Sequence, residues 1–169
     1  MKNLTQLGLQ HNKLKIIKSS YFNHLTNLEI LFLDGNEINE IEPESFSDLK
    51  NLIDLRFDFN QLTSIKKHYF KNLNKLKHLI IGTNRIEYIE EGSFSDLQNL
   101  THLGLQNNKF KVIRANYFRF LLCLKELYLD GNEIDLIEAK SFEGLKFLNK
   151  LWLNNDRISR LIKSISSNT

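Results

Sequence analysis

The hydrophobic residues of this chain recur with a fixed period of 24 residues. From each copy's first leucine the pattern L-x-x-L-x-L-x-x-N-x-L-x-x-I runs forward, so the third copy reads Leu52, Leu55, Phe57, Asn60, Leu62, Ile65. A period of this size is typical of a solenoid, in which one short unit stacks on copies of itself. The copies begin at Leu4, Leu28, Leu52, Leu76, Leu100, Leu124 and Leu148.

The apolar spacing within one copy fits neither a continuous helix nor a long strand. Leu7 and Leu9 stand two residues apart, so their side chains point to the same face of a short strand. One unit cannot bury such leucines alone, and they are expected to pack against those of the next unit. Each copy is therefore predicted to add one short strand to a shared parallel sheet.

Two further columns complete the unit. An asparagine follows each strand, and because an amide both donates and accepts, we expect it to bond the backbone of adjacent turns. A phenylalanine precedes a leucine by three residues, and the spacing F-x-x-L-x-x-L predicts a short helical or 3-10 turn. We interpret these phenylalanines as core rather than as a cofactor site. The columns are Asn12, Asn36, Asn60, Asn84, Asn108 and Asn132, and Phe22, Phe46, Phe70, Phe94, Phe118 and Phe142.

With this unit the chain resembles the leucine-rich repeat family, in the 24-residue subclass with a phenylalanine spine. Toll-like receptor ectodomains and matrix proteoglycans are members of that subclass. The resemblance covers nearly the whole chain and implies a right-handed α/β solenoid, or horseshoe. Seven short parallel strands would line its concave face, with short helical or 3-10 turns on the convex face. Residues 1–169 would form a single leucine-rich repeat domain.

Composition narrows the classes of protein to consider. The 23 basic and 20 acidic side chains leave a net charge of +3, too mild to indicate nucleic acid or a membrane surface as partner. No apolar run approaches the roughly 18 residues that a membrane helix needs. Cys123 is the only cysteine, so the chain lacks the cysteine-bearing caps of extracellular relatives. Two interpretations stay open: a segment of a longer protein, or a complete small protein that self-associates through its uncapped ends.

Successive units alternate in two columns. Tyr21, Tyr69 and Tyr117 precede the phenylalanine in odd units, where Ser45, Ser93 and Ser141 stand in even ones. A neighbouring column alternates in charge, which predicts that opposite charges lie side by side along the outer rim and fix the register of stacking. A longer echo returns LGLQHNKLKIIK of residues 7–18 as LGLQNNKFKVIR at 103–114, indicating duplication of a four-unit block. The charged column is Lys18, Glu42, Lys66, Glu90, Arg114 and Glu138.

The side chains between the strand leucines should line the concave sheet, the usual ligand surface in this family. One column there is rich in aromatic residues, which are typical of interface hot spots. Ile30, Phe32 and Phe59 form one candidate apolar patch, and Tyr128 with Trp152 forms another. Arg56, between two aspartates, is expected to pair locally or to meet a partner. The column reads Gly8, Phe32, Arg56, Ile80, Gly104, Tyr128 and Trp152.

A second concave column places His78 beside His102, because adjacent strands lie about 4.8 Å apart. Asp54 and Glu126 flank the pair. We expect an ordinary polar surface here, although such imidazoles can also titrate near neutral pH and alter ligand binding between pH 5 and 7. The column reads Gln6, Ile30, Asp54, His78, His102, Glu126 and Lys150.

The absence of catalytic motifs and the family resemblance together indicate the class of function. The chain holds no nucleophile–base arrangement, no glycine-rich phosphate loop and no C-x-x-C or H-E-x-x-H motif, so we predict no enzyme, no cofactor and no metal. The resemblance favours a recognition module of a secreted or cell-surface receptor or adhesion protein, including the innate-immune type. Its protein or glycan ligand would bind the concave face. The alternative is a structural, assembly or cytoplasmic scaffold protein. Two sequons, at Asn3 and Asn99, are candidate glycosylation sites.

Overall fold

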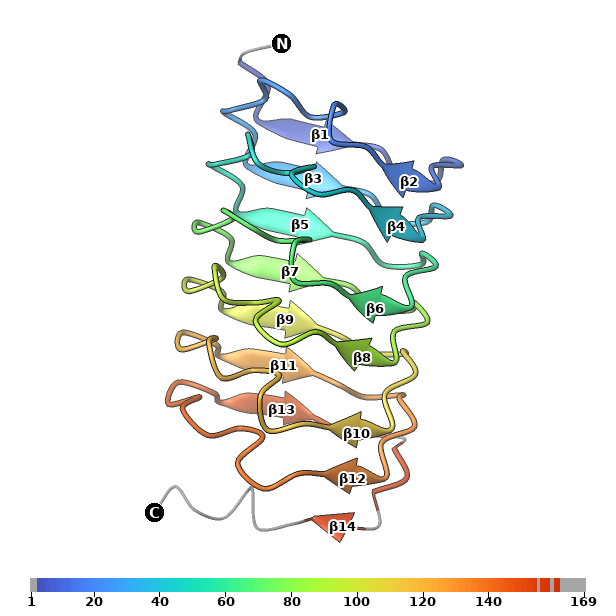
Figure 1. The fold of residues 1–169 in the computed structure, drawn as a ribbon, viewed down its shortest axis with the longest axis vertical. Coiled ribbons are helices and arrows are strands. Elements are labelled where there is room, and N and C mark those ends of the chain that lie inside the picture. Colours follow the sequence, from blue (N-terminus) through green and yellow to red (C-terminus); the bar gives the residue numbers. More distant parts are fainter. Residues whose placement is uncertain (1–2, 155, 159, 162–169) are drawn as a thin grey trace.

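The computed structural model describes residues 3–154, 156–158 and 160–161 of the 169-residue chain. Within them, the chain winds as a stack of coils whose inner strands form one seven-stranded parallel sheet (Figure 1). The sheet follows chain order, and each strand is in register with the strand 24 residues later, as Leu7 is with Leu31. Its strands are β1 (Gln6–Gly8), β3 (Ile30–Phe32), β5 (Asp54–Arg56), β7 (His78–Ile80), β9 (His102–Gly104), β11 (Glu126–Tyr128) and β13 (Lys150–Trp152).

A second set of strands, two residues each, lies across the coil from this sheet (Figure 1). Unlike the inner strands, they do not form one continuous ladder. They pair as β2 with β4, as β6 with β8, and as β10 with β12 and β14. Their bounds are β2 (Ile16–Ile17), β4 (Glu40–Ile41), β6 (Ser64–Ile65), β8 (Tyr88–Ile89), β10 (Val112–Ile113), β12 (Leu136–Ile137) and β14 (Arg160–Leu161).

The core fills the interior of the coils between the two sets of strands. The strand leucines Leu31, Leu55, Leu79, Leu103 and Leu127 are fully buried, as the two-residue spacing predicted. The solenoid of seven short parallel strands predicted from the sequence is therefore confirmed. Burying a leucine stabilises the folded chain by about 1.5–3 kcal/mol relative to leaving it exposed, and here each burial depends on a neighbouring coil.

The convex segments are turns rather than helices. Leu49 N–H donates to Phe46 O and Leu52 N–H to Leu49 O, both at 3.0 Å. These i→i+3 bonds come three residues apart instead of at consecutive residues, so they close separate turns. No helix occurs among the described residues, and the predicted helical or 3-10 turns are therefore not confirmed.

The asparagine column behaves as predicted. The Asn60 amide donates to Leu33 O in the preceding coil and to Phe57 O in its own coil, both at 3.0 Å. Its oxygen accepts the Ile38 N–H at 2.9 Å. One buried side chain thus satisfies backbone groups of two coils at a place where no strand pairing reaches them.

The coils are joined in two different ways, according to the alternation seen in the sequence. We number the coils 1 to 7 from their first leucines, and call coils 1, 3 and 5 the Tyr coils and coils 2, 4 and 6 the Ser coils. A Ser coil binds the Tyr coil before it through side chains. Ser45 Oγ donates to Ile17 O at 2.9 Å, and the Glu42 carboxylate accepts the Ser19 N–H at 2.9 Å.

The same contacts recur in the later pairs of coils. Ser93 and Ser141 bond Ile65 O and Ile113 O. Glu90 and Glu138 accept the N–H groups of Lys67 and Ala115. The phenylalanine rings also stack within these pairs, with centroids 5.8 to 6.2 Å apart, as Phe22–Phe46, Phe70–Phe94 and Phe118–Phe142.

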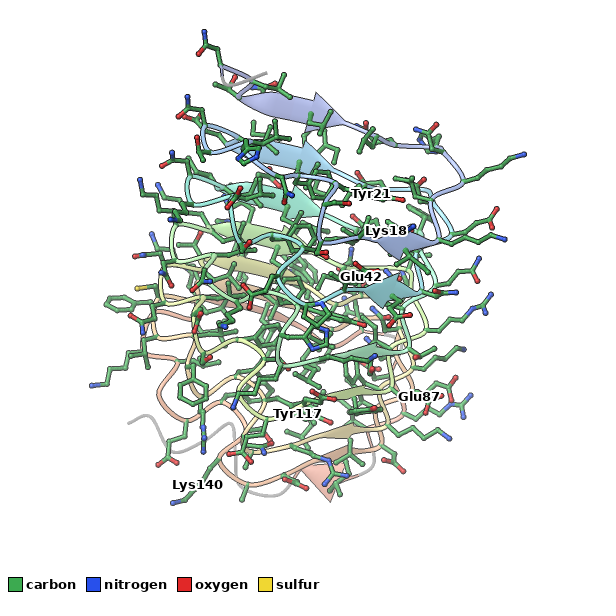
Figure 2. The ribbon with its side chains drawn as sticks, turned by 45° about the horizontal axis from the view of Figure 1, so that its top comes forward. Lys18, Tyr21, Glu42, Glu87, Tyr117 and Lys140 are labelled. Atoms are coloured by element: carbon green, nitrogen blue, oxygen red, sulfur yellow. The ribbon has the colours of Figure 1, made fainter. Side chains whose placement is uncertain are left out.

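The predicted ion pairs along the charged column are not formed in the described part of the chain. Lys18 and Glu42 lie on successive coils at the outer edge (Figure 2), but the glutamate binds main chain. A main-chain N–H is fixed in place, whereas a surface lysine loses side-chain entropy when it pairs. The alternation therefore sets the register through the glutamate and the backbone rather than through paired charges.

The junction from a Ser coil to the next Tyr coil uses aromatic side chains instead. His68 Nε2 lies 3.1 Å from Ile41 O, and the Ile41 backbone also hydrogen bonds the Tyr69 hydroxyl. Burial raises the pKa of Tyr69 to about 12. These contacts stand where β4 would otherwise pair with β6, so the outer ladder ends there. The outer ladder is interrupted again between β8 and β10, so the outer strands of coils 1 to 4 pair two by two.

The tyrosines differ in exposure according to what lies before them. Tyr69 and Tyr117 are only 3% and 5% exposed, whereas Tyr21 in coil 1 is 46% exposed. Tyr117 lies among side chains of coils 4 and 5, including Glu87 and Val112. Figure 2 shows Tyr21 and Tyr117 well apart along the stack, with Lys140 of a later coil beyond Tyr117.

A column of left-handed backbone follows the inner strands. In each of the first six coils one residue there has a positive φ, and only one of these is aromatic. Phe59 has φ 56° and is 63% exposed, so its backbone is strained and its ring is largely solvated. The column is His11, Gly35, Phe59, Thr83, Asn107 and Gly131.

Replacing this phenylalanine should stabilise the protein. Asparagine tolerates the left-handed region and already occupies the equivalent position as Asn107, so Phe59→Asn should raise the unfolding free energy by about 1 kcal/mol. Denaturant titration measures the change. Phe147→Asn is the matched control, because Phe147 is 61% exposed without a positive φ and should change stability by no more than about 0.5 kcal/mol. A loss of stability in Phe59→Asn would contradict the argument.

Candidate functional site on the concave sheet

Five of the predicted site residues line a single hollow on the inner sheet. Strand register brings His78 beside His102, and Ile80 beside Gly104. With Arg56, Gly104, Gln106, Tyr128 and Asp130 they enclose about 410 Å³. The hollow spans coils 3 to 6 and is built on the most regular part of the fold. The predicted residues in it are Arg56, His78, Ile80, His102 and Tyr128.

The remaining predicted residues lie around it. Trp152 is adjacent to Tyr128 in the next strand, and Ile30 and Phe32 lie on β3, next to Arg56. Phe59 does not share a strand with any of them, since it follows β5 in the left-handed turn. The two expected apolar patches are therefore unequal: the second is continuous with the hollow, and the first is divided between sheet and turn.

The aromatic end of the hollow is a stacked pair. The Tyr128 and Trp152 rings lie nearly parallel, at 8°, with centroids 6.3 Å apart. Trp152 remains 44% exposed. The Tyr128 hydroxyl donates to the Glu126 carboxylate, which also accepts from Lys150 Nζ at 2.8 Å. These two bonds, with the lysine first, lower the pKa of Glu126 to about 2, so this carboxylate stays ionised and holds both neighbours.

The guanidinium of Arg56, at the other end of the hollow, is already paired with a carboxylate of the same strand. It donates two bonds to the Asp54 carboxylate, at 3.1 and 2.9 Å. It also lies 4.9 Å from the centroid of the Phe32 ring, a cation–π distance. The local ion pairing expected from the sequence is present, and it covers one face of Phe32.

The two histidines contact each other and one carboxylate each. Their ring centroids are 4.6 Å apart. His78 Nδ1 lies 3.6 Å from Asp54, and His102 Nε2 lies 3.6 Å from Glu126. Burial and the neighbouring His78 lower the pKa of His102. Within the described residues no three His, Cys, Asp or Glu side chains converge as metal ligands.

Sequence reasoning did not select three residues that line the hollow, Gly104, Gln106 and Asp130. Gln106 stands two residues past Gly104, where coils 2, 3 and 6 carry aspartates. Its amide nitrogen approaches Asp58 Oδ1 at 3.5 Å, and its Oε1 is buried without a hydrogen-bond partner. Burial first, and Asp34 second, raise the pKa of Asp58 to about 6. The 24-residue period could have identified this column, but not the direction of the glutamine side chain.

The two sequon asparagines are exposed, away from the inner strands. Asn99 already donates its amide to Asn74 O at 2.7 Å, and Thr101 Oγ1 donates to Lys77 O. Glycan attachment at Asn99 therefore remains a prediction, and it would have to replace the first of these bonds.

The lowered pKa of His102 predicts a pH-dependent stability. The unfolded imidazole protonates near its ordinary value of 6.5, while the folded one resists protonation, so the unfolded state binds more protons as the pH falls. As the pH falls from about 7.5 to about 5.5, the native protein should therefore lose unfolding free energy relative to a His102→Gln variant.

The comparison between these two proteins is needed because Asp58 acts with the opposite sign. Its raised pKa makes its protonation below about pH 6 favour the folded state in both proteins. Urea titrations at several pH values give the difference directly. Parallel stability curves for the two proteins would contradict the assignment.

Comparisons with known proteins agree with this architecture. The family model described as "Leucine rich repeat" matches residues 2–62, 51–110 and 98–158. The comparison with curated proteins found no match. A solved structure titled "Crystal structure of TLR13-ssRNA13 complex" superposes with a TM-score of 0.92 and 30% sequence identity, covering 95% of this chain.

This chain spans 23% of the length of that Toll-like receptor chain, so the similarity concerns one stretch of a longer repeat array. No helix in the described part of the chain is long and apolar enough to cross a membrane. Because the family model matches in three successive blocks that cover most of the sequence, the chain belongs to the leucine-rich repeat family.

Proposed function

We propose that the chain is a protein-recognition module that binds its ligand on the concave face, at the hollow and the stacked Tyr128–Trp152 pair beside it. The observation that carries the proposal is this pair. Two parallel rings that are partly solvated, on a rigid sheet and next to a cavity, resemble the aromatic anchors of interface hot spots. A scattered exposed aromatic residue would carry no such weight.

The charge pattern around the hollow favours protein over nucleic acid as the ligand. The basic groups there are paired internally, Arg56 with Asp54 and Lys150 with Glu126. A polyanion needs unpaired cations along its path. The binding of ssRNA13 is a property of the Toll-like receptor in the solved complex.

We also propose that the chain belongs to a secreted or cell-surface protein of the receptor or adhesion type, including innate-immune receptors. The 24-residue phenylalanine-containing repeat and the Toll-like receptor neighbour support this. The sequons at Asn3 and Asn99 would then carry glycan outside the concave face. Phe59 would extend the contact surface, because an exposed ring on a strained backbone has no evident benefit to the fold itself.

An assembly role is the second candidate, supported by one observation. Coil 1 has an open apolar hollow of about 660 Å³ on its outer face, lined by its leucines together with Tyr21 and Phe22. Leu7 and Leu9 are only partly buried there, whereas their counterparts Leu31 and Leu33 are fully buried. Another coil, from the same protein or from a second copy, would complete this face. A cytoplasmic scaffold built in that way is the alternative.

The concave site can be tested with two matched double variants. Tyr128→Ala/Trp152→Ala removes the aromatic pair, and Leu122→Ala/Phe147→Ala removes exposed apolar surface outside the concave columns. A partner isolated with the native chain should, once purified, bind the first variant at least tenfold more weakly and the second as well as the native chain. Calorimetry or surface plasmon resonance measures both. Equal weakening by the two variants, or an effect of the second alone, would refute a concave site.

A direct test separates protein from nucleic acid ligands. A fluorescent single-stranded RNA of mixed sequence should show no saturable binding in an anisotropy titration at physiological salt, because the basic groups of the hollow are already paired. A polyanionic heparin fragment serves as a control for general attraction to the net charge of +3. Saturable RNA binding that Tyr128→Ala/Trp152→Ala abolishes would replace the protein ligand with RNA.

A further inference from the structure

One part of the hollow, which we call the gap, lies between Ile80 and Tyr128. Gly104 stands between them in register and contributes no side chain, so only the movable ends of Ile80 and Gln106 lie over it, 2.9 to 3.2 Å from where a Cβ would stand. Neighbouring strands lie about 4.8 Å apart, so the backbones of Ile80 and Tyr128 are separated by about 10 Å, and a flat group can enter beside Tyr128 when the Ile80 and Gln106 side chains turn aside. Trp152 covers one face of the Tyr128 ring, and the opposite side lines the gap.

The polar atoms of the hollow are unevenly satisfied. Every cationic or imidazole group has a carboxylate within the protein: Arg56 and His78 have Asp54, and His102 and Lys150 have Glu126. The acceptors on the other rim are not matched in this way. In the described part of the chain, neither Asp130 nor Asp58 forms an ion pair, and the Gln106 Oε1 is buried with no hydrogen bond at all. The site therefore has acceptors without partners, while its cationic and imidazole groups already lie against carboxylates.

A buried acceptor without a partner is costly, by about 1–3 kcal/mol, and a ligand that supplies the missing donor recovers that free energy. The ligand should also be flat, to enter the gap beside Tyr128, and positively charged, to meet the aspartates. A carboxylate ligand would have to displace Asp54 or Glu126 from groups they already hold. An ammonium group has the charge but not the flat shape.

We infer that the gap above Gly104 binds an arginine side chain of the protein partner. The guanidinium stacks on the free face of Tyr128, donates to Gln106 Oε1 and pairs with Asp130, while its methylene groups pass over Ile80. Planar stacking combined with several donors is particular to arginine, which is also among the residues enriched at interface hot spots. This inference rests on the concave face being the recognition surface, and it names the chemistry of the partner.

The inference can be tested without knowing the partner. The probe is N-acetyl-arginine methylamide, added to the full ¹⁵N-labelled chain and followed by NMR. The Gly104 amide and the side-chain amide of Gln106 should shift saturably, with a dissociation constant in the millimolar range for so small a ligand. The lysine analogue should bind about fivefold more weakly, and the glutamate analogue should cause no saturable shift.

The chain supplies a matched pair of glycine variants. A Cβ on Gly104 would lie 2.9 Å from Gln106 Oε1 and 3.1 Å from Ile80 Cγ2, so Gly104→Val fills the gap by moving only side-chain ends. Gly8 holds the same position four coils earlier, and a Cβ there meets the end of Gln10 in the same way. Gly104→Val should abolish the shifts, and Gly8→Val should leave them unchanged. Asp130→Asn, which keeps the shape and removes the charge, should weaken binding about fivefold.

Some outcomes would overturn the inference. The first is an absence of saturable shifts with the arginine probe at about 50 mM, a concentration about five times a dissociation constant of about 10 mM. The second is unchanged shifts in Gly104→Val. The third is saturable binding of the glutamate analogue in place of the arginine analogue. If Gly104→Val does not fold, Asp130→Asn and the comparison of the three analogues still decide the question. Failure here with a purified partner still weakened by Tyr128→Ala/Trp152→Ala would refute the arginine alone and leave the concave recognition surface standing.

Discussion

The structure depends on one constraint, which is that a single coil cannot bury its own hydrophobic residues. Each strand contributes inward-facing leucines, and these become fully buried only where coils lie on both sides, as the contrast between Leu7 and Leu31 makes plain. Backbone groups are satisfied in the same manner, by the next strand or by the asparagine of a neighbouring coil. Stability is accordingly a property of contacts between coils, as is typical of one-dimensional repeat proteins.

This dependence leaves the concave side chains free for other purposes. Leu55 and Leu79 hold the sheet from behind, so the concave-facing residues next to them on the strands, such as Arg56 and Ile80, have no part in the core. The hollow around Gly104 is consequently bordered by groups whose positions are set by strand register and by internal ion pairs. Preorganisation of this kind lowers the entropy lost on binding, which suits a recognition surface better than a mobile loop would.

Much of the fold could be predicted from the sequence, because a period repeated seven times averages out local ambiguity. The inner strands, the asparagine ladder and the neighbouring positions of His78 and His102 all follow from counting residues. The convex helical or 3-10 turns were not confirmed, since a spacing of three residues between apolar positions fits isolated turns as well as a helix. Ion pairing along the charged column was also wrong, because the sequence does not reveal that a main-chain N–H stands nearer to Glu42 than Lys18 does.

The candidate site was less predictable for a related reason. Tyr128, Trp152 and Arg56 were identifiable by residue type and column, whereas the importance of Gln106 depends on which way a flexible side chain turns. An unpartnered oxygen atom has no signature in a sequence. The order Ile80, Gly104, Tyr128 follows from the period, but the shape of the hollow around them depends on how their side chains turn.

The two kinds of junction restrict how an array of this type can evolve. Adding or losing one coil would bring two Ser coils or two Tyr coils together, and the contact of Ser45 with Ile17 O or that of His68 with Ile41 O would then have no counterpart at one junction. Changes in even steps preserve both junctions. The echo between residues 7–18 and 103–114 spans four coils, an even number, so the ancestral duplication copied whole pairs. The alternation of Tyr and Ser coils thus favours the gain or loss of coils in even numbers, because only even changes keep both kinds of junction.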